Sequence, residues 1–399
     1  MPVRATKRGA ERTPLDIDCD VLICGASFAG LTVARELATA IGPDGRRPDV
    51  VVVDRYEIGE RQTSACAVPL PWLEAMGLTG ALRQTFPSIV ARTPRDRFSW
   101  VLPQPFATFD YRALCELLAA QGDFRFETAK VEGRGAAESV VRARVATAAE
   151  SETGSVGTTA PDRITVLTDR GPIRAPLVVD ALGWRRVLAP AGEAEIQPPD
   201  AYLSRGLEVH PDGTGDELEL FLDRRYAPAG YGWSFPAGDE VRVGVGSFDP
   251  HHHVKDPTLR LTADVDREPH GFQGNWIPHR LRPATGDGIY FVGDSAGHCL
   301  PLSAEGIRPA FFFGLALGNE LRMVHEGRQT REQALRRYAA ISARHEPAYT
   351  WLLRLQRSVG HIVPHERLAT RLLGTLTAHG LQRRAWGRYL GIMPATNPD

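Results

Sequence analysis

The feature that most constrains this chain is a strand, a glycine turn and a helix start near its N-terminus. Asp20–Gly25 reads DVLICG, a short apolar run typical of a buried parallel strand. From Phe28 onward, apolar residues follow helical spacing. After a turn-rich connector, Val50–Asp54 reads VVVVD, a second buried strand. The pattern predicts a βαβ unit and therefore a parallel sheet covered by helices.

The turn in this unit, Gly25-Ala26-Ser27-Phe28-Ala29-Gly30, is typical of a dinucleotide-binding loop. Glycines allow a tight turn, and the helix N-terminus offers free N–H groups and a positive dipole to a pyrophosphate. Ser27 stands where the usual pattern has its middle glycine, and its side chain is small enough for close approach. Asp54, followed by Arg55, is placed to accept ribose hydroxyls. A plain tight turn and a strand-end cap are the alternatives.

A second loop of this kind lies about 270 residues later. Gly288–Val292 reads GIYFV and leads into Gly293-Asp294-Ser295-Ala296-Gly297-His298. Asp294 is expected to accept a ribityl or ribose hydroxyl, and the helix start at Gly306 and Ile307 is expected to face a flavin ring and the second phosphate. Together, the two loops predict the FAD-binding arrangement of glutathione-reductase-type flavoproteins.

The composition of the chain is that of a globular protein. Of its 399 residues, 43% are hydrophobic and 24% charged, and the net charge of −1 does not favour nucleic-acid binding. The five cysteines lack CxxC spacing, which argues against a disulfide framework or a zinc site and favours a reducing cytoplasm. The N-terminus has no apolar signal core, and apolar runs such as 311–317 are too short to span a bilayer.

Further along the chain, the pattern changes twice. Residues 110–121 look helical, and strands are expected at 141–145, 164–168 and 177–180, with a polar loop between the first two strands. Alternating segments between 201 and 248 predict antiparallel strands, and the chain is mostly helical from Gly306. The expected division is a tail (1–17), a discontinuous FAD domain (18–66, 106–190, 281–330), a β-rich substrate domain (67–105, 191–280) and a helical C-terminal region (331–399).

A third motif places the chain near a known family. Residues 228–236 read PAGYGWSFP, and Gly244-Val245-Gly246 follows. This YxWxFP and GxG pattern resembles the substrate-domain signature of FAD-dependent geranylgeranyl reductases, within the para-hydroxybenzoate-hydroxylase-like superfamily. Tyr231, Trp233 and Phe235 alternate, so their rings are expected on one face of a strand, as an aromatic wall for an apolar substrate. An ordinary aromatic sheet core is the alternative.

The resemblance, which covers about residues 18 to 325, implies further contacts with FAD. Cys66, beside Ala65 in TSACAVP, corresponds to a cysteine close to the flavin, although a packing role is equally open. Arg112 corresponds to an arginine that contacts the pyrophosphate, and Val131 to a strand residue that meets the adenine. The remaining cofactor positions in this reading are Gly183 in VVDALGWRR and Pro301.

The activity that the resemblance implies is reduction of carbon–carbon double bonds in an isoprenoid chain. Such a bond needs a hydride that no side chain can supply, and in this reading the hydride comes from N5 of reduced FAD. The electron donor, NAD(P)H or a reduced partner protein, is left open by the sequence.

Two further side chains are candidates for proton transfer beside the flavin. His298 and Glu305 follow the second loop, and for each a purely structural role is the alternative. His251-His252-His253 could bind a metal, but a polar loop is the preferred reading, and no metal is expected.

The C-terminal region carries a basic bias. Residues 331–399 contain eleven arginines, no lysine and four acidic residues, interleaved with apolar stretches such as WLLRLQ. Such a surface can rest on anionic lipid, which suits a cytoplasmic protein that associates with membranes, and a solvated cap on the core is the alternative.

Three rival functions share these features. A flavin monooxygenase would share both FAD loops, and a halogenase would share the aromatic motif, although no lysine that could serve a halogenase lies near the first loop. A flavin-containing carrier of an apolar ligand is the non-enzymatic alternative.

Overall fold

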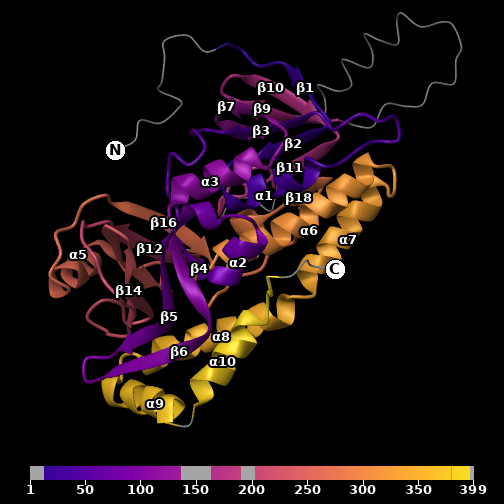
Figure 1. Ribbon diagram of the computed structural model, residues 1–399. Helices are drawn as coiled ribbons and strands as arrows, with labels where there is room; N and C mark the ends of the chain where they lie inside the picture. Colours follow the sequence, from indigo (N-terminus) through magenta and orange to yellow (C-terminus); the bar gives the residue numbers. More distant parts are fainter. Residues whose placement is uncertain (1–12, 136–162, 190–202, 379, 396–399) are drawn as a thin grey trace, which may run out of the picture.

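The computed structural model of the protein describes residues 13–135, 163–189, 203–378 and 380–395. The strand expected at 141–145 and the polar loop after it lie outside the described residues. In the described part, the chain forms three sheets and a set of C-terminal helices (Figure 1).

The central sheet has six strands and contains both predicted loops. Its order is β17-β18-β11-β2-β3-β7, and every neighbouring pair from β18 to β7 is parallel. The strands are β2 (Val21–Cys24), β3 (Val50–Asp54), β7 (Arg125–Thr128), β11 (Leu177–Asp180), β17 (Thr285–Gly286) and β18 (Ile289–Phe291). The apolar residues of β2, β3, β11 and β18 are buried, as in other parallel sheets, whereas the edge strands β7 and β17 are partly exposed. The predicted βαβ unit is confirmed.

Helices cover this sheet and bring the two loops together. α1 (Phe28–Leu37) packs against both α3 (Tyr111–Ala120) and α6 (Ile307–His325), and α7 (Arg331–Ala343) packs on α6. A smaller sheet, in the order β1-β10-β9-β8, lies at the far edge of this unit (Figure 1). It consists of β1 (Ile17–Asp18), β8 (Val131–Arg134), β9 (Ile164–Thr168) and β10 (Gly171–Ala175).

The third sheet has eight strands in the order β16-β12-β15-β14-β13-β5-β6-β4. The strands are β4 (Ala67–Pro69), β5 (Leu82–Arg92), β6 (Arg97–Phe109), β12 (Leu203–Val209), β13 (Leu218–Phe221), β14 (Gly230–Ala237), β15 (Glu240–Ser247) and β16 (Gln273–Pro278). The antiparallel strands predicted between 201 and 248 are present. α5 (Lys255–Asp264) covers one face of β12 and β15, over a small core of valines and aromatic residues.

The long hairpin of β5 and β6 meets the C-terminal helices. α2 (Leu70–Ala75) and the 3₁₀ turn η2 (Thr79–Ala81) precede the hairpin, and the 3₁₀ turn η3 (Gly293–Ala296) precedes α6. After α7 come α8 (Glu346–Ile362), α9 (Glu366–Ala378) and α10 (Leu381–Leu390), and both α9 and α10 contact β6 (Figure 1). No helix in the described ranges is both long and apolar enough to cross a membrane.

Candidate active site

The first loop has the backbone geometry that its glycines suggested. Gly25 adopts φ +113°, and a Cβ there would overlap the carbonyl oxygen of Ala181. A Cβ on Gly30 would overlap the carbonyl of Gly25, so α1 could not lie this close to the turn with a larger residue. Ser27 occupies the N-cap position of α1 without capping it, since its hydroxyl pairs with Tyr111 Oη at 3.1 Å. The first N–H groups of α1 are therefore left for a ligand.

Asp54 holds this loop against the end of β3. Its carboxylate accepts hydrogen bonds from the N–H of Ala26 at 2.8 Å and of Tyr56 at 3.0 Å. Burial raises the pKa of Asp54, and these two donors oppose that rise. The side chain also lines the large cavity described below, as does Arg55. Asp54 can thus fix the turn and still face a ribose.

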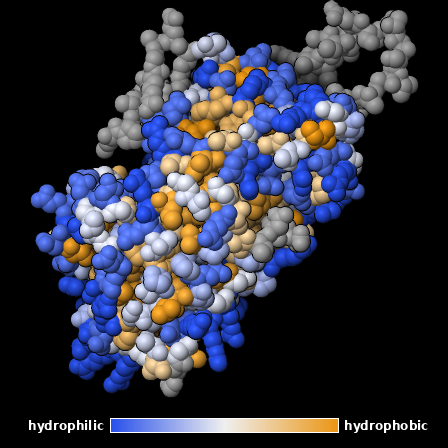
Figure 2. Space-filling model, in the orientation of Figure 1, coloured by the Kyte–Doolittle hydropathy of each residue, from blue (hydrophilic) through white to orange (hydrophobic). Residues whose placement is uncertain are grey.

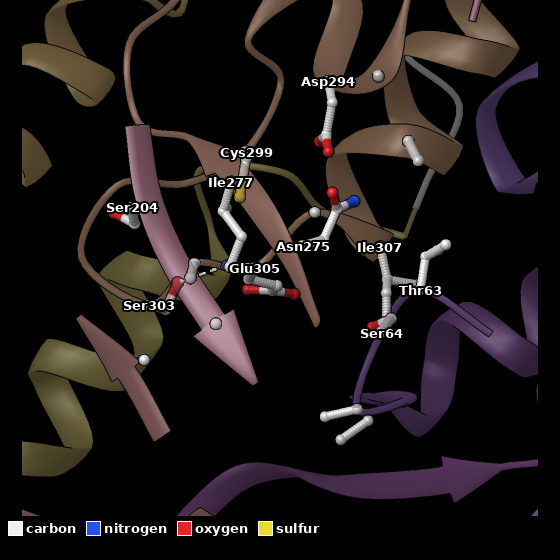
Figure 3. Close-up of a pocket in the computed structure, with 18 of the residues that line it drawn as sticks. Thr63, Ser64, Ser204, Asn275, Ile277, Asp294, Cys299, Ser303, Glu305 and Ile307 are labelled. Atoms are coloured by element: carbon white, nitrogen blue, oxygen red, sulfur yellow. Dashed lines mark hydrogen bonds between the residues drawn. The ribbon is translucent and has the colours of Figure 1, made fainter. Parts of the chain in front are cut away.

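The second loop presents a carboxylate to the same cavity. Gly293 adopts φ +65°, and a Cβ there would lie 3.0 Å from Cβ of Ala29 in the first loop. Asp294 points into the cavity (Figure 3), and burial raises its pKa to about 6. No donor among the described residues bonds to its side chain. An acceptor placed in this way fits the hydroxyl of a ribityl chain.

One continuous cavity of about 810 Å³ joins these loops to the eight-stranded sheet. Its first part is lined by the two glycine-containing loops and by Val131 and Gly183. Its second part is apolar and lies between the sheet and the C-terminal helices. The apolar lining residues include Ile89, Trp100, Phe106, Leu218, Leu220, Leu355, Val359, Leu376 and Trp386. A pocket that pairs a polar end with an apolar chamber suits a cofactor beside a hydrophobic substrate.

The three predicted aromatic residues line this cavity. Tyr231, Trp233 and Phe235 alternate with buried residues along β14, and the Tyr231 and Trp233 ring centroids are 6.2 Å apart. The structure also explains the GxG that follows. Gly244 is the cross-strand partner of Trp233, and a Cβ on it would overlap the indole ring. The glycine therefore provides the space in which the ring lies.

A buried carboxylate that sequence reasoning missed anchors Trp233. Glu208 Oε2 accepts the indole N–H at 2.6 Å, while Oε1 lies 2.9 Å from His210 Nε2 and accepts from Gln273 at 2.8 Å. Gln273 also donates to the carbonyl oxygen of Ser64, beside the predicted flavin contact Ala65. The sequence did contain a signal for this residue. Glu208 lies within the strand sequence LSRGLEV, on the same face of the strand as Gly206.

The loop before α6 forms the other wall of the cavity. Glu305, Gly306 and Ile307 line it, with Glu305 at its centre (Figure 3). Glu305 forms an ion pair with Arg308 and accepts a hydrogen bond from the hydroxyl of Tyr389 in α10. The roles of Arg308 and Tyr389 were missed, because neither lies in a recognisable motif.

Two predicted catalytic side chains do not reach the cavity. Cys66 adopts φ +54°, its thiol turns back to the Ser64 carbonyl oxygen at 3.1 Å, and burial raises the pKa of the thiol. Its neighbours Ala65 and Ala67 line the cavity instead. His298 is fully buried, stacks on Phe313 with centroids 3.6 Å apart, and bonds to Ser342 at 3.0 Å. The packing alternatives given for both residues match these positions.

Several other predicted site residues have partners within the protein. Arg112 is exposed and paired with Glu116, and its backbone lies against Gly59. The carbonyl oxygen of Pro301 accepts from Gln356 in α8, so Pro301 links its loop to the C-terminal helices. The three consecutive histidines bond separately, His251 to Asp249, His252 to the Tyr226 carbonyl and His253 to Arg205. No group of three metal-ligating side chains converges in the described ranges.

Comparisons with known proteins agree with this geometry. No family model matches the chain. It is 29% identical over 189 residues to a digeranylgeranylglycerophospholipid reductase of Methanocella arvoryzae, covering 43% of this chain but only 47% of the relative. A digeranylgeranylglycerophospholipid reductase 2 of Methanosphaera stadtmanae matches at 24% identity over 347 residues, covering 82% and 84%.

Solved structures extend the comparison to the fold. A geranylgeranyl bacteriochlorophyll reductase-like protein of Thermoplasma acidophilum superposes with a TM-score of 0.69 at 17% identity, over 86% of this chain and 88% of the other. A probable FAD-dependent monooxygenase of Pseudomonas aeruginosa, pqsL, gives 0.59 at 17% identity over 88% and 98%. The flavin-dependent brominase Bmp2 gives 0.59 at 14% identity over 93% and 99%.

The chain therefore shares the fold of these flavoenzyme structures, as the sequence predicted. The curated proteins that it matches by sequence are named geranylgeranyl or digeranylgeranylglycerophospholipid reductases, which confirms the predicted resemblance.

Proposed function

We propose that this protein is an FAD-dependent oxidoreductase that reduces carbon–carbon double bonds of an isoprenoid substrate. The observation that carries the proposal is the single cavity, which joins two dinucleotide loops to an apolar chamber with an aromatic wall. The relatives named as geranylgeranyl reductases support the same reading.

The described residues fit FAD at the polar end of the cavity. The turn at Gly25–Gly30 and the N-terminus of α1 would bind the pyrophosphate, and Asp54 the ribose. Asp294, to which no described residue donates a side-chain hydrogen bond, would accept a ribityl hydroxyl. Bound FAD, once reduced, supplies the hydride that an alkene needs and that no side chain can provide.

The side chains of the apolar chamber would then orient the substrate and exclude water. Tyr231 is held by its bond to the Ser303 carbonyl oxygen and Trp233 by Glu208, so both rings are fixed before a substrate arrives. Tyr389 donates a hydrogen bond to Glu305, and because both side chains line the cavity, this pair would deliver a proton to the second alkene carbon. Cys66 and His298 would support the packing around the site.

NAD(P)H or a reduced partner protein would supply the electrons. The protein would work in the cytoplasm and take up an apolar small molecule, and its basic C-terminal helices would contact membrane surfaces.

The second candidate is a flavin monooxygenase or halogenase, because pqsL and Bmp2 share the fold.

A single experiment separates the candidates. The flavin is reduced anaerobically with dithionite, substrates bearing a geranylgeranyl group are added, and flavin absorbance and product mass are followed. Reoxidation with a gain of two hydrogens per step supports the reductase. A flavin that stays reduced until oxygen is admitted, followed by a gain of one oxygen atom, supports a monooxygenase. A flavin that no substrate reoxidises supports a carrier.

A further inference from the structure

The C-terminal helices form a positive pole on a nearly neutral protein. Residues 344–395 contain eight arginines and two glutamates, with no lysine or aspartate, whereas the whole chain carries a formal charge of −1. The rest of the chain therefore carries a formal charge of −7. Charge concentrated in this way orients a protein toward an anionic surface.

Within the described ranges, these arginines form no ion pairs that would stabilise the fold. Seven exposed arginines lie on α8, α9 and α10 or next to them: Arg354, Arg357, Arg367, Arg371, Arg383, Arg384 and Arg388. None of them pairs with a carboxylate of a described residue. Elsewhere, Arg46, Arg83 and Arg125 each pair with an aspartate. The guanidinium groups on these helices are free to meet an external anion.

Exposed apolar side chains are interleaved with the arginines. Nine large hydrophobic side chains are exposed in the described part of the chain, and four of them fall between residues 351 and 381. They are Trp351 (49% exposed), Leu368 (45%), Leu372 (41%) and Leu381 (39%). Leu368 and Leu372 are one turn apart on α9, beside Arg367 and Arg371. Figure 2 shows apolar and hydrophilic patches interleaved over the lower part of the molecule, where these helices lie.

The apolar chamber reaches solvent on the same helices. Trp351 on α8 and Ala385 on α10 both line the cavity and are exposed, and Leu376 and Gln382 line it between them. The mouth of the chamber is thus bordered by residues that lie among the free arginines and exposed leucines. A soluble ligand needs no such apolar rim, whereas a lipid does.

We propose that the outer surface of α8, α9 and α10 docks on an anionic phospholipid bilayer, so that the chamber opens directly onto the lipid. The docking follows from the surface alone. The further step, uptake of an isoprenoid lipid without passage through water, rests on the function proposed above. An acidic soluble protein would satisfy the arginines, but it would leave Trp351, Leu368, Leu372 and Leu381 without an apolar partner.

The test uses the full-length, FAD-loaded protein and co-sedimentation with vesicles. Vesicles of phosphatidylcholine alone are compared with vesicles that contain about one third phosphatidylglycerol. We expect binding to the anionic vesicles only. The variant R367Q/R371Q/R383Q/R384Q should bind about 600-fold more weakly, because each of the four arginines near a lipid surface contributes roughly fivefold. The control R47Q/R260Q/R328Q/R336Q makes the same change in net charge at exposed arginines away from these helices, and it should bind as the parent does.

A second variant separates docking from simple charge adsorption. L368S/L372S keeps every arginine and changes only exposed side chains, so it should fold normally and still elute from immobilised heparin like the parent. Its vesicle binding should fall about tenfold. Equal binding of both quadruple variants, or unchanged vesicle binding of L368S/L372S, would overturn the proposal. Because none of these readouts needs turnover, failure of docking is distinguishable from failure of the reductase assignment.

Discussion

Arg308 and Glu305 form a buried bidentate ion pair at the N-terminus of α6, with nitrogen–oxygen distances of 2.7 and 2.9 Å. The third guanidinium nitrogen donates to the carbonyl oxygens of Leu390 and Met393, at the end of α10. One side chain therefore links the loop that faces the candidate flavin site to the last helix of the chain.

Breaking this pair should destabilise the protein strongly. R308M leaves the buried Glu305 carboxylate without a cationic partner, so we expect the free energy of unfolding to fall by about 3–5 kcal/mol in urea titrations. E305Q/R308M removes both charges and should recover part of that loss. R47M breaks an exposed pair with Asp123 and should cost less than about 1 kcal/mol. A loss for R308M no larger than that for R47M would contradict the assigned role.

Gly244 should be essential because of Trp233. In G244A, the added Cβ overlaps the indole ring, so the ring must leave its place beside Glu208. We expect kcat/KM for an isoprenoid substrate to fall about 100-fold, as for other misplaced active-site groups, while FAD binding is retained. G387A is the matched control, because its Cβ meets no atom within 4 Å and alanine favours the helix. Equal activity of G244A and the parent enzyme would contradict the proposed role of Trp233 in an aromatic wall for the substrate.

Trp386 should limit the length of chain that the chamber accepts. Its ring packs edge-on against Phe106 and Tyr389, with centroids 6.0 and 5.6 Å away, and it lines the apolar chamber. W386A enlarges the chamber, so the ratio of kcat/KM for a longer to a shorter isoprenoid should rise roughly tenfold. The ratio for W386F should lie between the ratios for the parent enzyme and for W386A. The measurement is a competition assay with mixed chain lengths, and an unchanged ratio in W386A argues against this limit.

Asp294 should give the FAD-free protein a pH-dependent stability. Its folded pKa, about 6, lies above its ordinary value of 3.8, so the folded state holds the proton more tightly than the unfolded state. Stability contributed by the protonated form is therefore fully present below about pH 4 and lost as pH rises through 6. We expect about 1–3 kcal/mol to be lost over that window in the parent but not in D294N, measured by Tm against pH.

The same variant tests the cofactor contact. D294N should bind FAD more weakly than the parent at pH 8, because an amide is a poorer acceptor than a carboxylate for a ribityl hydroxyl. Fluorescence titration with FAD measures this difference. Equal FAD affinity would show that Asp294 does not contact the cofactor.

Much of the fold was predictable because it depends on short-range patterns. Apolar runs and glycines that lie within a few residues of one another predict the buried strands β2 and β3, the turn at Gly25 and the start of α6 at Ile307. The hairpin of β5 and β6 was not predicted. Its stability comes from partners far along the chain, β13 and the C-terminal helices, and a single sequence does not show these pairings.

The candidate site likewise combines features that the sequence predicts with features that only the tertiary structure shows. By itself, the sequence determined the two glycine-containing loops, the two aspartates that follow strands, and three aromatic rings on one face of β14, because backbone geometry and strand period act locally. Only the tertiary structure decided that Glu208 anchors Trp233, that Arg308 and Tyr389 meet Glu305, and that Cys66 and His298 turn away from the cavity. Those relationships join residues up to 84 positions apart. They depend on how whole elements pack, which the identity of each residue does not reveal.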